Sequence, residues 1–198
     1  WAVEIPQTQV GDTVLIFGPG QRGLASVVAA REAGAGKIIV TGLAADSNKL
    51  QMALALGADH IIDVQNENVV DRVRALTNGK GADVIVEVTS YATQPVREAL
   101  DCVRMGGTVV LAGVKGFKPV SDFVSDLIVM KEITIKGAIG VTSSGYKKAI
   151  EMIERRKYPL ELMHTHNFEL EEAELAIKTL ARQIEGQESV HSCLIPVA

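Results

Sequence analysis

The chain has 198 residues, of which 47% are hydrophobic, and a formal net charge of −4 at pH 7. The hydrophobic content excludes a disordered chain, and the scattered lysines and arginines argue against a nucleic acid or a membrane surface as the main partner. Two cysteines, Cys102 and Cys193, form no disulfide framework and no metal-ligand spacing. The sequence also has no apolar run of about 18 residues and no signal-peptide pattern, so we expect a cytoplasmic protein.

The first predicted strand ends in a glycine-rich turn that a helix follows. Residues 14–17 are all apolar, which favours a parallel strand buried on both faces, because a strand with one wet face alternates apolar and polar residues. In the turn, Gly18 permits the tight bend, Gly20 leaves room for a pyrophosphate, and Gly23 lets the helix pack against the strand. The spacing Gly18-x-Gly20-x-x-Gly23 between a strand and a helix predicts a dinucleotide-binding turn.

The start of that helix supplies the groups that would bind the ligand. The backbone N–H groups of Gln21, Arg22 and Gly23 have no acceptor within a helix that begins here, and they lie at the positive end of the helix dipole. Such a terminus binds anions, so we expect these residues to hold the pyrophosphate of a dinucleotide.

Strands and helices alternate along the following residues. Further strands are predicted at residues 37–42, 60–64, 82–88, 108–114 and 133–139, and helices at residues 47–57, 66–76, 94–105 and 122–130. Alternation with short connections indicates parallel strands joined by right-handed crossovers. The fold class is therefore α/β, a doubly wound, six-stranded parallel sheet of the Rossmann type.

The pattern changes after Gly140. Two more helices are predicted at residues 144–157 and 171–182 and a last strand at residues 192–197, but they complete no further strand–helix unit. We therefore divide the chain into a dinucleotide-binding domain, residues 1–141, and a C-terminal helical and strand segment, residues 142–198. The sequence begins with Trp1 rather than Met, and we expect it to be a piece of a longer protein.

In a doubly wound sheet the ligand binds outside the carboxyl ends of the strands. Several predicted strands are followed by residues that this rule places around one crevice. The candidate cofactor-binding residues beyond the glycine-rich turn are Gly42, Thr89, Tyr91, Ala112, Gly113, Val114, Ala138 and Ile139. Lys115, after the fifth strand, is a further candidate that would point toward a substrate.

The sequence resembles the medium-chain dehydrogenase/reductase superfamily, and its zinc-dependent alcohol and polyol dehydrogenases of the sorbitol and threonine type in particular. The resemblance covers nearly the whole chain and rests on the order and spacing of short motifs. Besides the glycine-rich turn, these are GDTV at 11–14, LGAD at 56–59, GADV at 81–84, GGTVV at 106–110, IKGA at 135–138 and THNFELE at 165–171.

This resemblance implies the coenzyme-binding part of an oxidoreductase that transfers hydride between NAD(P) and a small alcohol, polyol or carbonyl substrate. In zinc-dependent members a metal in a separate GroES-like catalytic domain, N-terminal to the glycine-rich turn, binds the substrate oxygen. We therefore expect zinc only in that domain, assign no catalytic or metal-binding residue here, and expect residues 142–198 to pack on it. The alternatives are a zinc-independent quinone or enoyl reductase of the same superfamily and a non-catalytic NAD(P)-binding sensor module.

The choice between NAD and NADP stays open. In NAD-preferring relatives an acidic residue at the end of the second strand binds the adenosine ribose, and this sequence has Gly42 there. Ser47 and Lys49 are candidates to hold the additional phosphate of NADP, while Asp46 is a candidate to replace the missing acid. A plain helix-capping role for Asp46 and Ser47 is the third interpretation.

The four histidines, at positions 60, 164, 166 and 191, are not spaced as a metal-binding set. We expect His164 and His166 to lie on an extended segment in a loop or interface. His191 occupies the place where alcohol dehydrogenases often carry an arginine that reaches the pyrophosphate, which makes it a candidate cofactor contact. The alternative is a polar surface residue.

The sixth predicted strand, residues 133–139, indicates an assembly. An apolar strand at the edge of a sheet exposes unpaired backbone groups unless something covers them. The family that this chain resembles pairs such edges across a two-fold axis, so we expect a homodimer through the sixth strand.

Overall fold

The computed structural model of the chain describes residues 1–196. It separates into two compact units, Trp1–Tyr158 and a second unit that begins at Pro159. The first unit therefore extends beyond residue 141. Within the described residues, no helix combines the length and the apolar character needed to cross a membrane.

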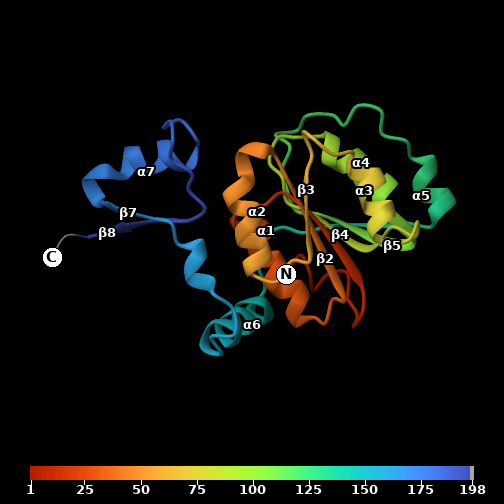
Figure 1. Ribbon diagram of the computed structural model, residues 1–198, viewed down its shortest axis with the longest axis horizontal. Helices are drawn as coiled ribbons and strands as arrows, with labels where there is room; N and C mark the ends of the chain where they lie inside the picture. The colour runs from red at the N-terminus through yellow and green to blue at the C-terminus, as the bar shows by residue number, and fades with distance from the viewer. Residues whose placement is uncertain (197–198) are drawn as a thin grey trace. The chain divides into compact units, whose positions relative to one another are not determined.

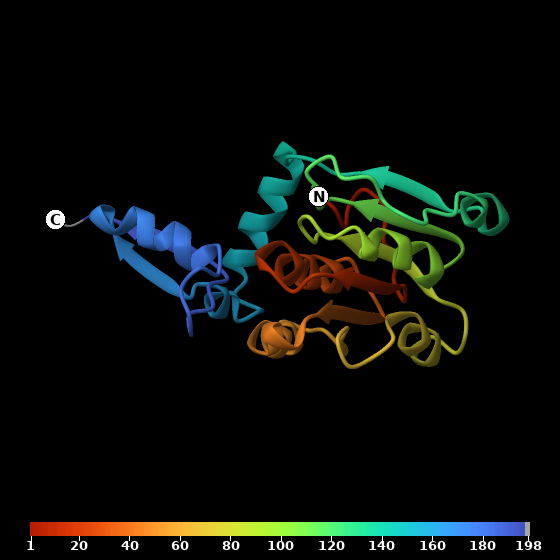
Figure 2. The ribbon, with the colours of Figure 1, turned by 90° about the horizontal axis from the view of Figure 1, so that it is seen from above.

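The first unit is built on one sheet of six parallel strands. The strands are β1 (Thr13–Phe17), β2 (Lys37–Gly42), β3 (His60–Asp63), β4 (Ala82–Glu87), β5 (Val103–Leu111) and β6 (Thr134–Gly137). Their spatial order is β3-β2-β1-β4-β5-β6. All strands are parallel, and the order in which successive strands are added reverses between β1 and β4. Figure 2 shows them side by side, from β6 in teal through β1 in dark red to β2 in brown. This order confirms the doubly wound Rossmann sheet.

Helices cover both faces of this sheet (Figure 1). One face carries α1 (Gln21–Glu32) and α2 (Ser47–Ala55), and the other carries α3 (Val69–Leu76), α4 (Gln94–Cys102) and α5 (Asp126–Lys131). A further helix, α6 (Ser143–Glu154), follows β6. The strands are therefore buried on both sides, which explains why β1 reads as a continuous apolar run rather than an alternating one.

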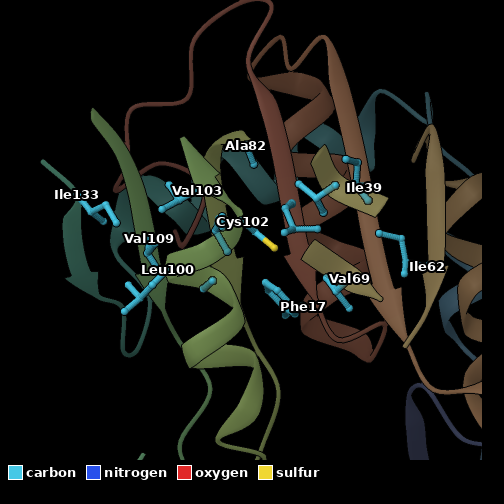
Figure 3. Close-up of a cluster of buried hydrophobic side chains, with 14 residues drawn as sticks. Phe17, Ile39, Ile62, Val69, Ala82, Leu100, Cys102, Val103, Val109 and Ile133 are labelled. Atoms are coloured by element: carbon cyan, nitrogen blue, oxygen red, sulfur yellow. The ribbon is translucent and has the colours of Figure 1, made fainter. Parts of the chain in front are cut away.

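The core on the α3–α4 face is shown in Figure 3. Leu15 and Phe17 of β1 belong to this cluster together with Leu100 and Cys102 of α4. Cys102 is 1% exposed, which confirms that it is a core residue. Burial raises the pKa of its thiol to about 12, so the thiol stays protonated and unreactive at neutral pH.

The boundary between α4 and β5 differs from the prediction. The helix expected over residues 94–105 ends at Cys102, and the strand expected over residues 108–114 runs from Val103 to Leu111. The reason is tertiary: a side chain at Gly81 would lie 2.6 Å from the Cys102 carbonyl oxygen, so the start of β4 approaches the chain too closely for another helical turn. Arg104 is then held by an ion pair of 2.5 Å from its Nε to Oδ1 of Asp83.

Other elements are shorter than predicted for local reasons. The helix expected from residue 66 begins at Val69, because Asn68 caps it through a bond of 3.0 Å from the Asp71 N–H to its Oδ1. The helix expected from residue 122 begins at Asp126, since Asp122 has a left-handed backbone (φ 55°) that no helix accommodates. The sixth strand spans Thr134–Gly137, not residues 133–139.

The second unit is a small α/β arrangement. Two parallel strands, β7 (His166–Glu169) and β8 (Ser192–Ile195), pack against α7 (Ala173–Leu180). Short 3-10 turns at Leu160–Met163 and Leu170–Glu172 precede β7 and α7. The helix predicted over residues 171–182 is thus shorter, and of the strand predicted over residues 192–197, residue 197 lies outside the described residues.

Candidate functional site

The carboxyl ends of the strands in the first unit meet at one edge of the sheet. Backbone hydrogen bonds of 2.8–3.1 Å continue the ladders one residue beyond the strands, and so hold the segments that follow side by side. The donor and acceptor pairs are Gly18 N to Thr41 O, Val88 N to Phe17 O, Ala112 N to Glu87 O and Ala138 N to Leu111 O. These bonds place Gly18, Val88, Ala112 and Ala138 along the carboxyl edge of the sheet, which includes the switch point between β1 and β4.

The glycine-rich turn leaves three backbone donors at the start of α1. Gly20 is the N-cap residue, with extended backbone (φ −69°, ψ −178°) and no side-chain capping bond. The first bond of the helix runs from Leu24 N–H to the Gly20 carbonyl (2.9 Å), so the N–H groups of Gln21, Arg22 and Gly23 precede the helical ladder. Gln21 and Arg22 are exposed, and this terminus can accept an anion.

The glycines of the turn differ in what a side chain would meet. A Cβ on Gly23 would lie 1.8 Å from the Gly18 carbonyl oxygen, so the helix packs there too closely for any other residue. A Cβ on Gly20 would meet no atom within 4 Å. Open space above Gly20, next to three free N–H groups, fits the close approach of a dinucleotide pyrophosphate.

Gly42, at the end of β2, has a packing role. A Cβ at this position would lie 2.8 Å from Cγ of Pro19 and 3.1 Å from Cδ2 of Leu50. A larger side chain at the end of β2 would therefore require Pro19 or Leu50 to shift, so glycine at this position lets the glycine-rich turn pack closely on β2.

The polar side chains in the segment after Gly42 differ in their burial. Asp46 and Lys49 are both buried, with 3.9 Å between Asp46 Oδ1 and Lys49 Nζ, and Asp46 Oδ2 accepts a bond of 3.2 Å from the Leu43 N–H. Asp46 occupies the N-cap position of α2 but makes no side-chain capping bond to that helix. Ser47 is exposed.

A buried ionic cluster lies at the carboxyl end of β4, and sequence reasoning did not find it. Glu87, the last residue of β4, is 0% exposed, and its Oε1 accepts a bond of 2.8 Å from Lys115 Nζ. The Thr89 N–H (2.9 Å) and hydroxyl donate to the same oxygen, and Lys115 Nζ also reaches the Thr89 carbonyl (2.5 Å). Lys115 is therefore directed at Glu87 and Thr89, against the expectation that it points toward a substrate.

Glu87 Oε2 is buried without a hydrogen-bond partner among the described residues. A glutamate at the end of a parallel strand, with a lysine after the next strand, is the sequence signal that would have indicated this pair. Since the strand ends meet at one edge, the two charges fall together there.

Three apolar or aromatic side chains are exposed on the segments that follow β4, β5 and β6. Tyr91, Val114 and Ile139 are 67%, 61% and 89% exposed. Tyr91 has a left-handed backbone (φ 63°), and its N–H donates to the Val114 carbonyl at 3.1 Å. A Cβ on Gly113 would lie 2.0 Å from the Thr89 carbonyl oxygen, so the loops after β4 and β5 pack closely at this point. The exposed apolar side chains on these loops could contact the planar parts of a ligand bound at the carboxyl edge of the sheet.

The second unit gathers residues that are far apart in the sequence. His164, His191 and Cys193 place one potential ligand atom each within 4.8 Å of one another, although their spacing indicated no such set. His166 is not part of this group. Its ring stacks on the Phe168 ring, with 5.9 Å between the ring centroids. His191 belongs to this unit, and its contact with a cofactor stays a prediction.

The comparisons with known proteins agree with this architecture. Residues 23–155 match the family model described as zinc-binding dehydrogenase. The chain belongs to the zinc-binding dehydrogenase family. A Mycobacterium tuberculosis protein named "Probable alcohol dehydrogenase" is 38% identical over 99% of this chain and 54% of its own length. A sorbitol dehydrogenase of Halalkalibacterium halodurans is 29% identical over 94% of this chain and 52% of its own length.

Solved structures give the same result. An alcohol dehydrogenase from Thermotoga maritima matches 99% of this chain with a TM-score of 0.87 and 31% identity, over 54% of its own length. The 2R,3R-butanediol dehydrogenase of Bacillus subtilis matches 100% of this chain with a TM-score of 0.84 and 26% identity, also over 54% of its own length. The chain thus spans about half the length of the relatives it matches.

Proposed function

We propose that this chain binds a nicotinamide dinucleotide in the crevice at the carboxyl edge of its six-stranded sheet. The observation that carries the proposal is the glycine-rich turn: three backbone N–H groups precede the ladder of α1, and the space above Gly20 is open. The pyrophosphate binds at Gly20, Gln21, Arg22 and Gly23, and the segments after β4, β5 and β6 line the path of the nicotinamide half.

The reaction that follows from this proposal is hydride transfer between NAD(P) and an alcohol, polyol or carbonyl carbon. The cofactor supplies the hydride chemistry, and this chain supplies its binding and orientation. The relatives named as alcohol, sorbitol and butanediol dehydrogenases support this substrate class over the quinone or enoyl reductase alternative.

We also propose that residues 142–198 pack on a catalytic domain outside this chain. Their packing on a GroES-like catalytic domain is supported by apolar side chains that α6 and α7 leave exposed, among them Ile153 (60%) and Ile177 (69%). Catalytic zinc would be held in that domain, and the location of the protein would be the cytoplasm, which its two free cysteines suit. The 198-residue chain by itself should therefore bind cofactor and oxidise no alcohol.

Calorimetric titration of the purified chain with NADH and NADPH in parallel tests the proposal. Binding of either cofactor supports it, and a tenfold preference, about 1.4 kcal/mol, assigns the specificity. If NADPH is preferred, Ser47 and Lys49 are the candidate phosphate contacts, and Lys49→Ala tests whether Lys49 carries the preference. If NADH is preferred, Asp46 is the candidate ribose contact. Failure of both cofactors to bind a folded chain would refute the dinucleotide site.

The exposed edge of the sheet supports a homodimer. β6 pairs with β5 on one side only, and Ile135 on this edge strand is 36% exposed. An edge strand with an apolar side chain pairs readily with a second copy. Sedimentation equilibrium should give a dimer at micromolar concentration, and Ile135→Lys should shift it toward monomer. A wild-type monomer would contradict the proposal.

A further inference from the structure

The second unit contains a convergence of three side chains that the dinucleotide site does not use. His164 Nδ1 and His191 Nδ1 are 3.2 Å apart, and the Cys193 Sγ lies 3.9 Å from the first and 3.8 Å from the second. The three atoms therefore form a small triangle. We propose that this triangle is one face of a tetrahedral Zn²⁺ site, with His164, His191 and Cys193 as its protein ligands.

The dimensions of the triangle are those of a zinc coordination shell. Zinc binds histidine nitrogen at about 2.0–2.1 Å and cysteine sulfur at about 2.3 Å, and in tetrahedral geometry these lengths separate two nitrogens by about 3.3 Å and a nitrogen from the sulfur by about 3.6 Å. The edges in the structure, 3.2, 3.8 and 3.9 Å, lie close to these values. Small shifts of the three atoms, which shorten the two nitrogen–sulfur edges and slightly widen the nitrogen–nitrogen edge, would bring the triangle to the tetrahedral values.

The backbone holds the ligands in register. His191 and Cys193 are two residues apart on an extended segment, so their side chains share a face. β7 and β8 pair in parallel with Asn167 opposite Cys193, and the His191 carbonyl accepts bonds from the Thr165 N–H (3.0 Å) and hydroxyl (3.1 Å). His164 lies immediately before this anchored threonine. The strand pairing places Cys193, and the bonds between Thr165 and the His191 carbonyl hold the two histidines near it.

A neighbouring side chain orients one of the imidazoles. His164 Nε2 lies 2.7 Å from Oδ1 of Asn167, an oxygen that only accepts hydrogen bonds, so in neutral His164 the proton is on Nε2. Nδ1 then carries a lone pair directed at His191 Nδ1. Metal-bound histidines typically donate their other ring N–H to an oxygen in this way, which fixes the tautomer that binds the metal.

The donor set narrows the choice of metal. Two imidazoles and a thiolate suit a transition metal such as Zn²⁺, whereas Mg²⁺ and Ca²⁺ require oxygen ligands. Three protein ligands leave the fourth position to water or a small anion. Binding releases the Cys193 thiol proton, so metal affinity rises with pH. The proposal departs from the expectation that this chain contributes no metal ligand, and it gives His191 a role other than a pyrophosphate contact.

Cobalt substitution of the metal-free 198-residue chain provides the test. Within the described residues this is the only group of three or more His, Cys, Asp or Glu side chains that converge this closely, so one Co²⁺ per chain should bind, with a thiolate-to-cobalt charge-transfer band and the d–d spectrum of a tetrahedral ion. Zn²⁺ should displace the Co²⁺. Cys193→Ser should abolish the charge-transfer band, and His164→Asn or His191→Asn should weaken binding at least tenfold.

Matched controls keep this test specific. Cys102→Ser removes the other thiol, which is 1% exposed, and His166→Asn removes a neighbouring imidazole whose ring nitrogen bonds the Thr165 hydroxyl (2.9 Å). Both variants should bind Co²⁺ as the wild type does. A wild-type chain without the charge-transfer band, or a Cys193→Ser variant that retains it, would overturn the proposal. Neither result depends on whether NADH binds, so the two proposals fail separately.

Thiol alkylation gives an independent readout. Burial keeps the Cys102 thiol protonated and inaccessible, so Cys193 accounts for the fast reaction with iodoacetamide in the folded chain. Saturating Zn²⁺ should slow alkylation of Cys193 at least tenfold, and Mg²⁺ should leave the rate unchanged. Equal rates with and without Zn²⁺ would show that the thiol is not a ligand.

Discussion

The glycine-rich turn after β1 and the triangle of His164, His191 and Cys193 would bind their ligands with different parts of the chain. The turn offers backbone N–H groups from consecutive residues at the start of α1. The triangle offers side-chain atoms from residues up to 29 positions apart, joined by the pairing of β7 with β8. A backbone site is sensitive to added volume and indifferent to most side-chain chemistry, whereas a side-chain site depends on every ligand and on strand register.

The largest expected effect on stability concerns Lys115, because its side chain pairs with the buried Glu87 at the end of β4. Lys115→Met removes the cation that neutralises Glu87, whose side chain is 0% exposed. Breaking a buried ion pair from one side leaves an uncompensated charge, so the free energy of unfolding should fall by about 3–5 kcal/mol in urea titrations. Lys118→Met, at an exposed position of the same loop, should change it by less than about 0.5 kcal/mol.

Adding Glu87→Gln to Lys115→Met should restore part of the lost stability, since the stranded charge is then gone. A Lys115→Met chain as stable as wild type would mean that Glu87 is protonated or solvated and that the crevice does not depend on this pair.

The second effect separates the two units. Zn²⁺ at 100 times its dissociation constant should stabilise the unit that begins at Pro159 by about 2.7 kcal/mol, because only its folded form presents the three ligands together. Hydrogen exchange at Thr165 and His166, whose N–H groups donate to the His191 carbonyl, should slow accordingly, while exchange in β1 stays unchanged. The Cys193→Ser variant serves as the control. Slower exchange in both units would indicate nonspecific metal binding.

The contrast between sites formed by consecutive residues and sites formed by distant residues also explains what the sequence could predict. The order of elements, the fold class and the glycine-rich turn were predictable because each depends on residues within one strand, turn or helix. The cofactor-binding residues inferred from the rule about carboxyl strand ends remain a prediction. The predicted end of α4 was wrong because the close approach of Gly81, just before β4, to the Cys102 carbonyl involves residues far apart in the sequence.

The side-chain clusters were not predictable for the same reason. Glu87 and Lys115 meet only because β4 and β5 are neighbours in the sheet, and Cys193 meets His164 only through the β7–β8 register. The packing role of Gly42 was also not predictable, since Gly42 ends β2 and Pro19 follows β1, and the two meet only in the folded sheet. Composition and periodicity carry no information about such pairs.

The third prediction tests the backbone site itself. Gly20→Ala should leave the free energy of unfolding nearly unchanged, because its Cβ meets no protein atom and its φ of −69° suits alanine. Its affinity for the cofactor that binds the wild type should fall at least tenfold, about 1.4 kcal/mol, since the methyl group occupies the approach of the pyrophosphate. Gly23→Ala is the converse case and should lose stability, because its Cβ would lie 1.8 Å from the Gly18 carbonyl oxygen. Unaltered cofactor affinity in Gly20→Ala would place the ligand elsewhere.

The smallest effect on stability is expected at Glu32, the last residue of α1, at the end of the helix away from the glycine-rich turn. The charged groups there are more exposed than those of Lys115 and Glu87. Its Oε1 accepts bonds of 2.7 Å from Lys157 Nζ and from the Tyr158 hydroxyl, and these partners hold the pKa of Glu32 below its ordinary value of 4.5. A lowered pKa in the folded state contributes stability that is present above the unfolded pKa and is lost as the pH falls through the folded pKa.

Glu32→Gln should therefore lower the free energy of unfolding at pH 7 by less than about 1 kcal/mol and flatten its decline below pH 4.5. Glu154→Gln, at an exposed position at the end of α6, should leave the pH profile of the wild type intact. If both variants follow the wild-type profile, the Glu32 cluster contributes nothing measurable, and the buried Glu87–Lys115 pair remains the ion pair to test for a contribution to the stability of the first unit.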